Sequence, residues 1–421
     1  MVITEEYKNC LEILKNSSSN LLISGKAGTG KTTLIQYFRD NSKKNIVVVT
    51  PTGIAALNCR GQTIHSFFGL PPKMVNLKAI YNRKNNKIFK KIDTLIIDEI
   101  SMVRADLLDG VDKILRLNGK DPKKPFGGVQ TIFIGDLYQL PPVLTNEDAE
   151  IFSQLYESPY FFDANSFSID NFENIELTTI FRQKQLQFIE ILNKIRNGNI
   201  SFPDLNIINQ RVTTEPIPES HIILTTTNSV AQSINQTKLN NIKGKEFSYL
   251  GSTEGIFPTE DRYLPVEMDL KLKKGARVLF VKNDREGKWV NGTLGEVEKL
   301  GKDKIQVRLD ESNTVVNVEI EEWDNIEYGP DKDTEEIREI VIGKLKQYPL
   351  KLAWAITIHK SQGMSFDKVC LDFTRSPFTH GQTYVALSRA RKLEGLLLTK
   401  RIFPNDILID ERILDFYQRL K

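Results

Sequence analysis

Residues Gly25–Thr32 have the sequence GKAGTGKT, which matches the G-x-x-x-x-G-K-[ST] spacing of a phosphate-binding loop. Its glycines let backbone N–H groups turn toward phosphate oxygens, and a helix that begins at the loop adds its partial positive charge. We expect Lys31 to reach the outer phosphates and the Thr32 hydroxyl to bind Mg²⁺. The nucleotide contacts predicted from this loop are Gly25, Ala27, Gly28, Thr29, Gly30, Lys31 and Thr32.

An acidic pair, Asp98 and Glu99, follows the apolar run at residues 94–97. At the carboxyl end of a strand, Asp98 is expected to hold Mg²⁺ through water, and Glu99 to orient and deprotonate an attacking water. Such a pair alone is commonly a helix cap, but its place about 70 residues after the phosphate loop favours catalysis. A kinase-type H-R-D-x-x-x-x-N loop is absent from the sequence, so water is the better acceptor.

Apolar runs alternate with helical stretches in both halves of the chain, which predicts parallel sheets covered on both faces. Predicted helices include residues 4–15, a helix from Lys31, and residues 229–239. The strands are expected at residues 20–24, 46–50, 94–98 and 131–135, then at 221–225, 353–356, 369–372 and 395–399. The fold class is therefore α/β, with two domains of similar kind.

A different pattern interrupts the second α/β domain. Between residues 275 and 321, short strands with Gly and Asn-Asp turns between them predict a small antiparallel barrel. The α/β pattern resumes near Tyr348. An acidic segment, residues 319–339, leaves the barrel with ten acidic and two basic side chains, although the whole chain has a net charge of +3. A basic bulk with one acidic segment fits a polyanion partner.

Several classes of protein are disfavoured by the sequence. It holds no apolar run near the ~20 residues of a membrane span, and residues 1–6 do not begin a signal peptide. Cys10, Cys59 and Cys370 are odd in number and far apart, which supports neither disulfides nor a cysteine metal site. We therefore expect no membrane partner and a cytoplasmic protein of bacterial type.

Motifs along nearly the whole chain resemble those of the PIF-type (petite integration frequency) helicases and their RecD-like relatives, in the B branch of helicase superfamily one. They are TPTGIAA at 50–56, GQTIHSF at 61–67, DEISM at 98–102, GDLYQLPP at 135–142, FRQ at 181–183, TIHKSQG at 357–363 and YVALSRA at 384–390. The stretch from Asp106 to Gln130, which ends in PFGGVQ, is similar to the PIF signature segment, and RecD proteins are expected to lack that segment.

The resemblance adds catalytic residues to Lys31 and Glu99. It implies that Gln139 senses the γ-phosphate and that Arg182 and Arg389 are two arginine fingers, with ATP in the cleft between the α/β domains. Arginine suits this task because its fixed, always-charged fork stabilises transition-state phosphate charge. Gln362 and Gly363 are implied as further nucleotide contacts, and ATP with Mg²⁺ as the cofactors.

The same resemblance implies a set of single-strand contacts. Small hydroxyls and backbone amides that hold phosphates give a grip that is independent of base sequence. For either histidine of the set, a buried structural role is the alternative. The residues are Thr52, Thr63 and His65 in the first domain, and Thr357, His359 and Ser361 in the second.

One position departs from the family pattern. Where the family usually has a glutamine that contacts the adenine edge, this chain has Tyr7. A tyrosine stacks or donates one hydrogen bond, but it cannot make a bidentate contact with adenine. The resemblance therefore does not predict selectivity for ATP over other nucleotides.

We predict four parts. RecA-like domain 1A covers residues 1–178, with a wedge, 1B, inserted at about 66–91. RecA-like domain 2A covers residues 179–265 and 346–421, and an SH3-like barrel, 2B, covers residues 266–345. The tail of the wedge is basic, with Arg83, Lys84, Lys87, Lys90 and Lys91.

The implied function is that of an ATP-dependent DNA helicase that moves 5′ to 3′ on single-stranded DNA and unwinds duplexes. RNA–DNA hybrids and G-quadruplexes are further implied substrates, with roles in replication, repair and telomere maintenance. The expected partners are single-stranded DNA and forked or tailed duplex DNA, bound by a monomer that can dimerise on DNA. The alternatives are a RecD-like translocase within a multi-subunit repair complex, and a nucleotide-binding scaffold or small-molecule phosphotransferase. An ATPase activity that depends on single-stranded DNA separates the last two from a helicase.

Overall fold

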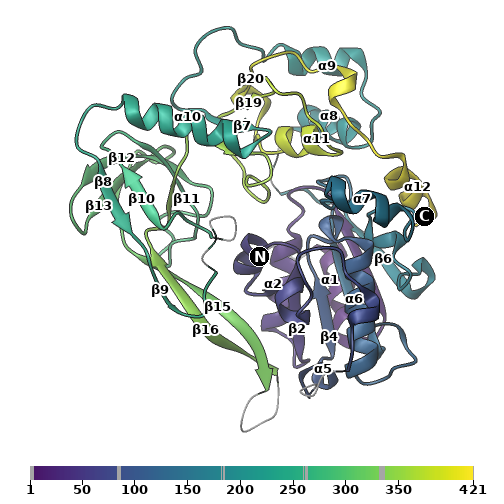
Figure 1. Ribbon diagram of the computed structural model, residues 1–421. Helices are drawn as coiled ribbons and strands as arrows, with labels where there is room; N and C mark the ends of the chain where they lie inside the picture. The colour runs from purple at the N-terminus through teal and green to yellow at the C-terminus, as the bar shows by residue number, and fades with distance from the viewer. Residues whose placement is uncertain are drawn as a thin grey trace. The chain divides into compact units, whose positions relative to one another are not determined.

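The computed structural model describes residues 4–82, 87–181, 183, 185–258, 260, 264–330 and 337–420. The chain forms two compact units (Figure 1). Unit 1 comprises Met1–Phe181, Asn325–Ile342 and Glu411–Lys421, and unit 2 comprises Arg182–Asp324 and Gly343–Asp410. The predicted boundaries of 2B and 2A include residues 325–342 and 411–421, which the structure groups with unit 1. The four-part division stays a prediction.

Unit 1 is built on a six-stranded parallel sheet in the order β3-β2-β4-β5-β1-β6. Its strands are β1 (Asn20–Gly25), β2 (Ile46–Thr50), β3 (Gln62–Thr63), β4 (Thr94–Ile97), β5 (Gln130–Gly135) and β6 (Phe172–Leu177). The four apolar runs predicted as strands in the first half are β1, β2, β4 and β5. Because every strand is parallel, all their carboxyl ends lie at one edge, the edge where ligands bind in such sheets.

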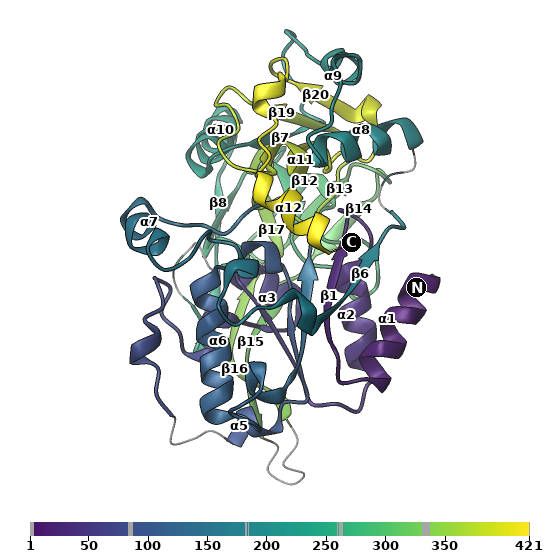
Figure 2. The ribbon, with the colours of Figure 1, turned by 90° about the vertical axis from the view of Figure 1, so that its right-hand side faces the viewer.

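Helices cover both faces of this sheet. Those of unit 1 are α1 (Glu5–Asn16), α2 (Lys31–Asp40), α3 (Gly53–Cys59), α4 (Ile64–Phe68), α5 (Lys87–Lys91), α6 (Ala105–Asn118), α7 (Asn146–Ser153) and α12 (Glu411–Arg419). Helices α1 and α2 pack on one face, and Figure 2 shows α6 on the other. In α1, Thr4 caps the first turn through the N–H of Tyr7, and Leu11 and Leu14 are buried at the predicted positions.

The C-terminal helix α12 belongs to unit 1 because of aromatic packing. Phe416 stacks on Phe162 with 4.4 Å between ring centroids, and its ring also meets Phe161 edge to face. Tyr417 stacks on Tyr138 at 4.8 Å. Aromatic pairs of this kind contribute about 0.5–1.5 kcal/mol each beyond the area that they bury.

The described residues of the acidic segment lie largely in two paired strands, which the sequence did not predict. Strand β15 (Glu321–Pro330) is paired with β16 (Ile337–Gln347), which in turn pairs with β9 (Ser252–Gly255). Ile326 and Tyr328 are buried on either side of the exposed Glu327, so the period of two that defines a strand is present within the acidic run. The Tyr328 hydroxyl accepts the N–H of Val48 from strand β2 at 3.2 Å.

Unit 2 contains a four-stranded parallel sheet in the order β18-β7-β19-β20. These strands are β7 (Ile222–Thr225), β18 (Ala355–Thr357), β19 (Val369–Asp372) and β20 (Leu396–Leu398), all within or next to the predicted runs. The helices of this unit are α8 (Leu186–Arg196), α9 (Phe202–Asn209), α10 (Asn228–Asn241) and α11 (Gln382–Leu387). The predicted α/β fold with parallel sheets is confirmed.

The predicted antiparallel insertion is also present. Its sheet has the order β14-β13-β12-β11-β17, around a buried core that includes Val278, Phe280, Val297 and Val307. The strands are β11 (Arg277–Phe280), β12 (Leu294–Leu300), β13 (Ile305–Leu309), β14 (Val315–Val318) and β17 (Leu350–Leu352), next to the pair β8 (Phe247–Leu250) and β10 (Asp269–Leu272). None of the helices in the described part of the chain has the length and hydropathy of a membrane span.

Candidate nucleotide and nucleic-acid site

The phosphate loop joins β1 to α2 at the carboxyl edge of the unit 1 sheet. Gly28 and Gly30 have φ angles of 86° and 78°, a left-handed conformation that glycine adopts without strain. A Cβ atom on Gly30 would overlap the hydroxyl of Tyr7. The Nζ of Lys31 donates to the carbonyl oxygens of Gly25 at 2.7 Å and Lys26 at 3.0 Å, so its ammonium group lies within the predicted loop.

Asp98 and Glu99 lie at the end of β4, as predicted. Asp98 is buried and accepts the N–H of Glu99 at 2.9 Å. Burial, followed by the charge of Glu99, raises the pKa of Asp98 to about 7. Glu99 has a φ of 54°, which is uncommon for a residue other than glycine and is typical of functional positions.

The chemistry of these residues fits Mg²⁺ with a nucleotide. A cation near Asp98 would offset the burial that disfavours its ionised form. On either side of Gly135, the buried hydroxyls of Ser24 and Ser101 have no hydrogen-bond partner among the described residues. No cluster of three His, Cys, Asp or Glu side chains in the described ranges could hold a metal alone. Asp98 and Thr32 would therefore hold Mg²⁺ together with phosphate and water, as is usual for this ion.

Gln139 follows β5 and is positioned by a residue that the sequence prediction did not select. Its Nε2 donates to Oδ2 of Asp136 at 3.3 Å, and its backbone N–H donates to the Asp136 carbonyl at 2.9 Å. Asp136 is fully buried and also accepts the N–H of Tyr138. The GDLYQ motif contained this signal, because an aspartate directly after a buried strand is well placed to fix the turn that follows.

Tyr7 does not have the free hydroxyl that a contact with the base would need. Its ring is 2% exposed, and its hydroxyl donates to the carbonyl oxygen of Thr29 at 2.6 Å. Beside Tyr7, the N–H of Phe181 donates to the carbonyl oxygen of Gly28 at 2.9 Å. Helix α1 and the segment that follows β6 therefore each make a hydrogen bond to the phosphate loop.

Two of the predicted DNA contacts in unit 1 are helix caps at the same sheet edge. The Oγ1 of Thr52 accepts the N–H of Ala55 at the start of α3, and the Oγ1 of Thr63 accepts the N–H of Ser66 at the start of α4. A capping hydroxyl that accepts an N–H keeps its own O–H as a donor, the polarity that a phosphate oxygen needs. The structure thus brings Thr52 and Thr63 to the same edge of the sheet as the phosphate loop and Asp98.

His65, the third predicted contact, is partly buried in α4. Its Nδ1 is buried and makes no hydrogen bond to the described part of the chain. Burial lowers the pKa of His65, so the neutral ring is favoured. A neutral ring attracts a phosphate less strongly than a charged ring does. A buried structural role, the alternative given for this histidine, therefore stays open.

In unit 2, the predicted contacts lie at and after the carboxyl end of β18. The Oγ1 of Thr357 accepts the N–H of Lys360 at 3.3 Å, and the hydroxyl of Ser361 donates to the Ile358 carbonyl at 2.7 Å. Burial lowers the pKa of His359 as well. Gly363 has a φ of 78°, and the buried Nε2 of Gln362 lacks a hydrogen-bond partner within the described ranges. Gln362 is therefore able to serve as the predicted nucleotide contact.

The two predicted arginine fingers differ in what the structure shows. Arg182 lies outside the described residues. Arg389 is 1% exposed, and its guanidinium donates to the carbonyl oxygens of Val385, Ser361 and Met364 and to the Ser388 hydroxyl. In this structure Arg389 therefore joins two motifs within unit 2, and its role as a finger stays a prediction.

Gln183 was not selected from the sequence, although it follows Arg182 directly. Its Nε2 donates to the carbonyl oxygens of Ser388 at 2.9 Å and Ala390 at 3.3 Å. These two oxygens flank Arg389. Gln183 is also buried. Its two hydrogen bonds therefore join the segment around residue 183 to the segment that carries Arg389.

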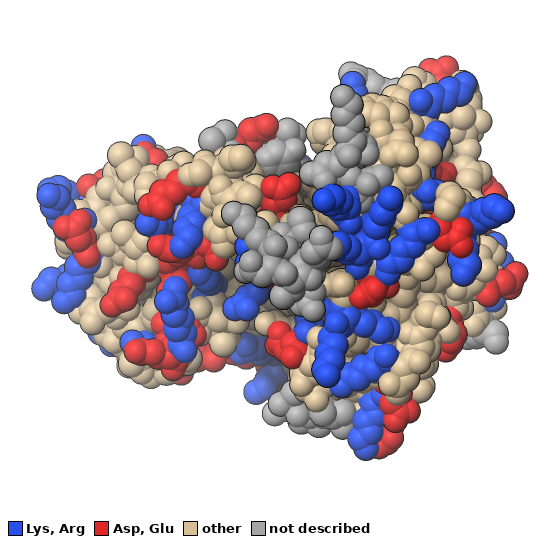
Figure 3. Space-filling view, turned by 90° about the horizontal axis from the view of Figure 1, so that it is seen from below, with Lys and Arg blue, Asp and Glu red and all other residues tan. Residues whose placement is uncertain are grey.

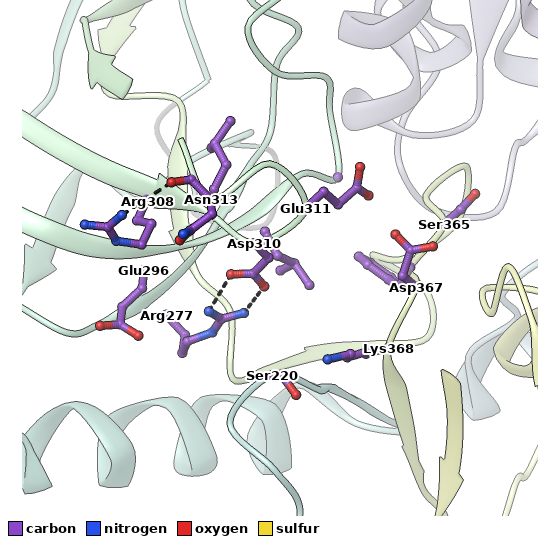
Figure 4. A pocket seen from close by; sticks show the side chains of 14 residues that line it. Ser220, Arg277, Glu296, Arg308, Asp310, Glu311, Asn313, Ser365, Asp367 and Lys368 are labelled. Atoms are coloured by element: carbon purple, nitrogen blue, oxygen red, sulfur yellow. Dashed lines mark hydrogen bonds and ion pairs between the residues drawn. The ribbon is translucent and has the colours of Figure 1, made fainter. Parts of the chain in front are cut away.

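A cavity of about 370 Å³ in unit 2 contains none of the predicted site residues (Figure 4). It lies between the antiparallel insertion and the segment Ser365–Lys368. Arg277 forms a two-pronged ion pair with Asp310 on its wall. Arg391 bridges two lining carboxylates, Glu311 at 2.6 Å and Asp367 at 2.8 Å. Arg277, Asp310, Glu311 and Asp367 are therefore paired within the protein.

The parallel sheet of unit 1, with a phosphate loop, an Asp-Glu pair and a buried glutamine at one edge, defines a P-loop nucleoside triphosphatase. Comparison with known proteins gives the family. The family model described as PIF1-like helicase matches residues 3–206, and one described as helicase matches residues 331–403.

The relatives agree with these matches. An ATP-dependent DNA helicase Pif1 of Bdellovibrio bacteriovorus is 30% identical over 431 residues, covering 100% of this chain and 92% of the relative. The crystal structure of Bacteroides sp Pif1 in complex with ADP-AlF4 has a TM-score of 0.90 at 38% identity, covering 100% and 97% of the two chains. Bacteroides Pif1 bound to ssDNA has a TM-score of 0.70 at 37% identity, with coverage of 100% and 97%.

The chain belongs to the PIF1-like helicase family. It is an ATP-dependent DNA helicase, which confirms the family, the fold class and the enzymatic activity expected from the motifs.

Proposed function

We propose that ATP hydrolysis at the carboxyl edge of the unit 1 sheet drives this helicase along single-stranded DNA in the 5′ to 3′ direction. Two hydrogen bonds support a coupling between ATP hydrolysis and the contacts that hold the DNA strand. The N–H of Asp98 donates to the carbonyl oxygen of Val49 at 3.0 Å, and the next residue, Thr50, donates its hydroxyl to the Thr52 carbonyl at 2.8 Å. A shift at the nucleotide therefore has a short, hydrogen-bonded route to the predicted grip at Thr52.

In this proposal each catalytic side chain has one task. Lys31 neutralises the outer phosphates, and Glu99 accepts a proton from the attacking water. Mg²⁺ held by Thr32 and Asp98 would supply charge neutralisation at the phosphates. Gln139, fixed by Asp136, positions the water or senses the γ-phosphate. Arg182 and Arg389 are proposed to stabilise the transition state, which requires Arg389 to leave its present carbonyl partners.

The strand is proposed to be held by its phosphates. Thr52, Thr63 and His65 form one set of contacts, and Thr357, His359 and Ser361 form the other. Lysine and arginine side chains also gather on part of the face seen in Figure 3. Among the basic residues of the described chain, Lys87 and Lys90 of α5 and Lys123 and Lys124 after α6 are exposed. Such a surface attracts a polyanion without reading its bases.

The proposed partners are single-stranded DNA and tailed or forked duplexes. The solved structure of Bacteroides Pif1 bound to ssDNA supports this choice. Replication and repair follow from the family, whereas RNA–DNA hybrids, G-quadruplexes, telomere maintenance, a cytoplasmic location and dimerisation on DNA stay predictions. Duplex unwinding by this chain alone would distinguish it from a RecD-like subunit that needs partners.

The grip at Thr52 can be tested with a matched control. Thr52→Val keeps the shape but removes the hydroxyl, and it also removes the cap of α3, which costs about 1 kcal/mol. Thr145→Val loses an equivalent cap, because Thr145 accepts the N–H of Asp148 at the start of α7. We expect Thr52→Val to weaken single-strand binding by about tenfold, the scale of one hydrogen bond to a charged group, and Thr145→Val to leave it unchanged. Equal affinities of the two variants would contradict the assignment.

A further inference from the structure

A buried phenol, that of Tyr7, lies against the phosphate loop. The hydroxyl of Tyr7 donates its only proton to the carbonyl oxygen of Thr29. Burial raises the pKa of Tyr7 to about 12, so the phenol remains protonated throughout the physiological pH range. Tyr7 is 2% exposed, and it cannot turn its hydroxyl to a base without breaking this bond.

The polar groups near Tyr7 are also hydrogen-bonded within the protein. The carboxylate of Glu6 accepts the N–H groups of Thr178 at 3.1 Å and Thr179 at 3.4 Å, and it also accepts the Thr178 hydroxyl. The Oγ1 of Thr29 donates to the Lys26 carbonyl at 3.0 Å. The carbonyl oxygen of Gly28 accepts the N–H of Phe181. Each of these groups already has a partner within the protein.

An aromatic face remains available beside the loop. The side chain of Phe181 is 43% exposed, and its ring centroid lies 6.3 Å from that of Tyr7. Its position is fixed by the backbone bond to Gly28 and by the anchoring of the preceding threonines to α1. Every nucleobase has a π-face, so stacking on such a ring does not depend on the pattern of donors and acceptors at the base edge.

Discrimination between bases needs polar groups that the wrong base leaves unpaired. A site built to hydrogen-bond one substrate rejects a mismatched analogue strongly, whereas a site that offers only apolar contact does not. Beside Tyr7 and Phe181, a nucleotide can contact the phosphate loop and stack on the Phe181 ring. The polar groups of Glu6, Tyr7, Gly28 and Thr29 described above are already hydrogen-bonded within the protein. The balance of interactions therefore favours binding through the triphosphate and the ring face.

We propose that the nucleotide site of this helicase accepts purine and pyrimidine triphosphates alike, because Tyr7 supports the phosphate loop instead of reading the base. This rests on the assignment of the P-loop as the hydrolytic site. GTP, CTP and UTP then support the same hydrolysis as ATP. The pyrimidines are expected to bind somewhat less tightly, since their smaller rings bury less area against Phe181.

Two measurements on the whole chain test the proposal. The first is kcat/KM for ATP, GTP, CTP and UTP with saturating single-stranded DNA. The expected values for ATP and GTP agree within about threefold, and those for CTP and UTP lie within about tenfold of them. A preference for ATP above about 100-fold, the scale of a site that reads polar groups, would overturn the proposal.

The second measurement separates base recognition from hydrolysis. Displacement of a fluorescent ADP by unlabelled ADP, GDP, CDP and UDP reports affinity without turnover. Similar affinities support the proposal even if hydrolysis fails with every triphosphate, a result that would contradict the ATPase assignment alone. Strong preference for ADP in this competition would overturn the proposal whatever the hydrolysis rates.

Variants at residue 7 test whether Tyr7 is responsible for the proposed lack of base selectivity. Tyr7→Phe keeps the ring and loses only the bond to Thr29, so it is expected to weaken all four nucleotides by a common factor. Tyr7→Gln places a free amide donor and acceptor there, and it is expected to raise the ATP to GTP ratio at least about tenfold. A changed ratio in Tyr7→Phe, or an unchanged one in Tyr7→Gln, would contradict the role given to Tyr7.

Discussion

Glu99 directly follows Asp98, a buried carboxylate with a raised pKa. Burial and the charge of Glu99 together raise the pKa of Asp98, while the backbone bond from Glu99 favours its charged form. A bound cation would shift this balance toward the ionised form of Asp98. Glu99 is the carboxylate that we propose as the acceptor of the proton.

Glu99→Gln removes that acceptor and keeps the shape of the side chain. We expect ATP binding to survive and DNA-stimulated hydrolysis to fall by about 10²–10⁴-fold, the scale of a lost general base. Stopped-flow or steady-state phosphate release measures the rate, and nucleotide displacement measures binding. Hydrolysis at the unaltered rate in the Glu99→Gln protein would remove Glu99 from the mechanism.

Lys351, on β17, gives a residue-scale prediction about stability. Burial first, and then the neighbouring charge of Lys360, lowers the pKa of Lys351 to about 8. The folded state then binds fewer protons than the unfolded state between about pH 8 and 10.5, so the stability contributed by Lys351 rises with pH across this window. At pH 7 the lysine is charged in both states, and its burial costs free energy.

Lys351→Met should therefore raise the free energy of unfolding at pH 7 by about 1–3 kcal/mol, with a smaller gain at pH 9.5. Urea unfolding at both values measures it. Lys274→Met, at an exposed lysine of the same unit, is the control and should change little at either pH. A variant that is no more stable than the parent at pH 7 would show that Lys351 is well solvated or paired.

The motifs identified Arg389 and Tyr7 as positions of interest, but they did not reveal what these side chains contact. Arg389 bonds groups from two motifs about 25 residues apart, and Tyr7 bonds a carbonyl in the loop 22 residues later. Contacts over such separations depend on how the helices and loops pack, which local spacing does not encode. Residue types were therefore predictable, whereas their partners were not.

Among the elements, α6 contacts three separate segments of unit 1. Its Asp106, Asp109 and Asp112 are spaced three residues apart, and all are buried. Asp106 accepts the N–H of Val75, Asp109 those of Asn165 and Ser166, and Asp112 that of Phe126. Three carboxylates on one helix thus cap three separate segments.

This arrangement gives the signature segment a physical role. The sequence pattern alone suggests a solvated acidic face, because aspartates are rarely buried without partners. Gly110 lies between Leu70 and Val75, and a Cβ atom there would be 3.1 Å from each of those side chains. Helix α6 therefore holds the segment that follows His65, part of the predicted wedge, against unit 1.

Asp106→Ala tests this role. The substitution leaves the N–H of Val75 buried without an acceptor and Arg104 without its ion pair, so the free energy of unfolding should fall by about 3–5 kcal/mol. Denaturant unfolding measures the loss. Glu150→Ala, at an exposed site on α7, is the matched control with an expected change within about 0.5 kcal/mol. A similar small change in Asp106→Ala would mean that the network does not hold the segment.

At the scale of the whole molecule, the parallel sheets and the antiparallel insertion were predictable because their strands are short apolar runs with turn residues between them. The edge strand β6 escaped prediction because its exposed positions carry polar residues, in the pattern Phe172, Glu173, Asn174. The paired strands β15 and β16 were not predicted, because their acidic composition is typical of a solvated linker. These strands are stabilised by the pairing of β16 with β9 and by the contact of β15 with β2. Both contacts exist only in the folded chain.

We propose that this chain alone converts ATP hydrolysis into movement along one DNA strand in the 5′ to 3′ direction. The most direct measurement compares unwinding of one short duplex that carries either a 5′ or a 3′ single-stranded tail, under single-turnover conditions with ATP. We expect efficient strand separation only with the 5′ tail, and none with the Glu99→Gln protein. Efficient opening only with the 3′ tail would contradict the proposed polarity, and failure to open either duplex despite DNA-stimulated hydrolysis would favour a translocase that needs partner subunits.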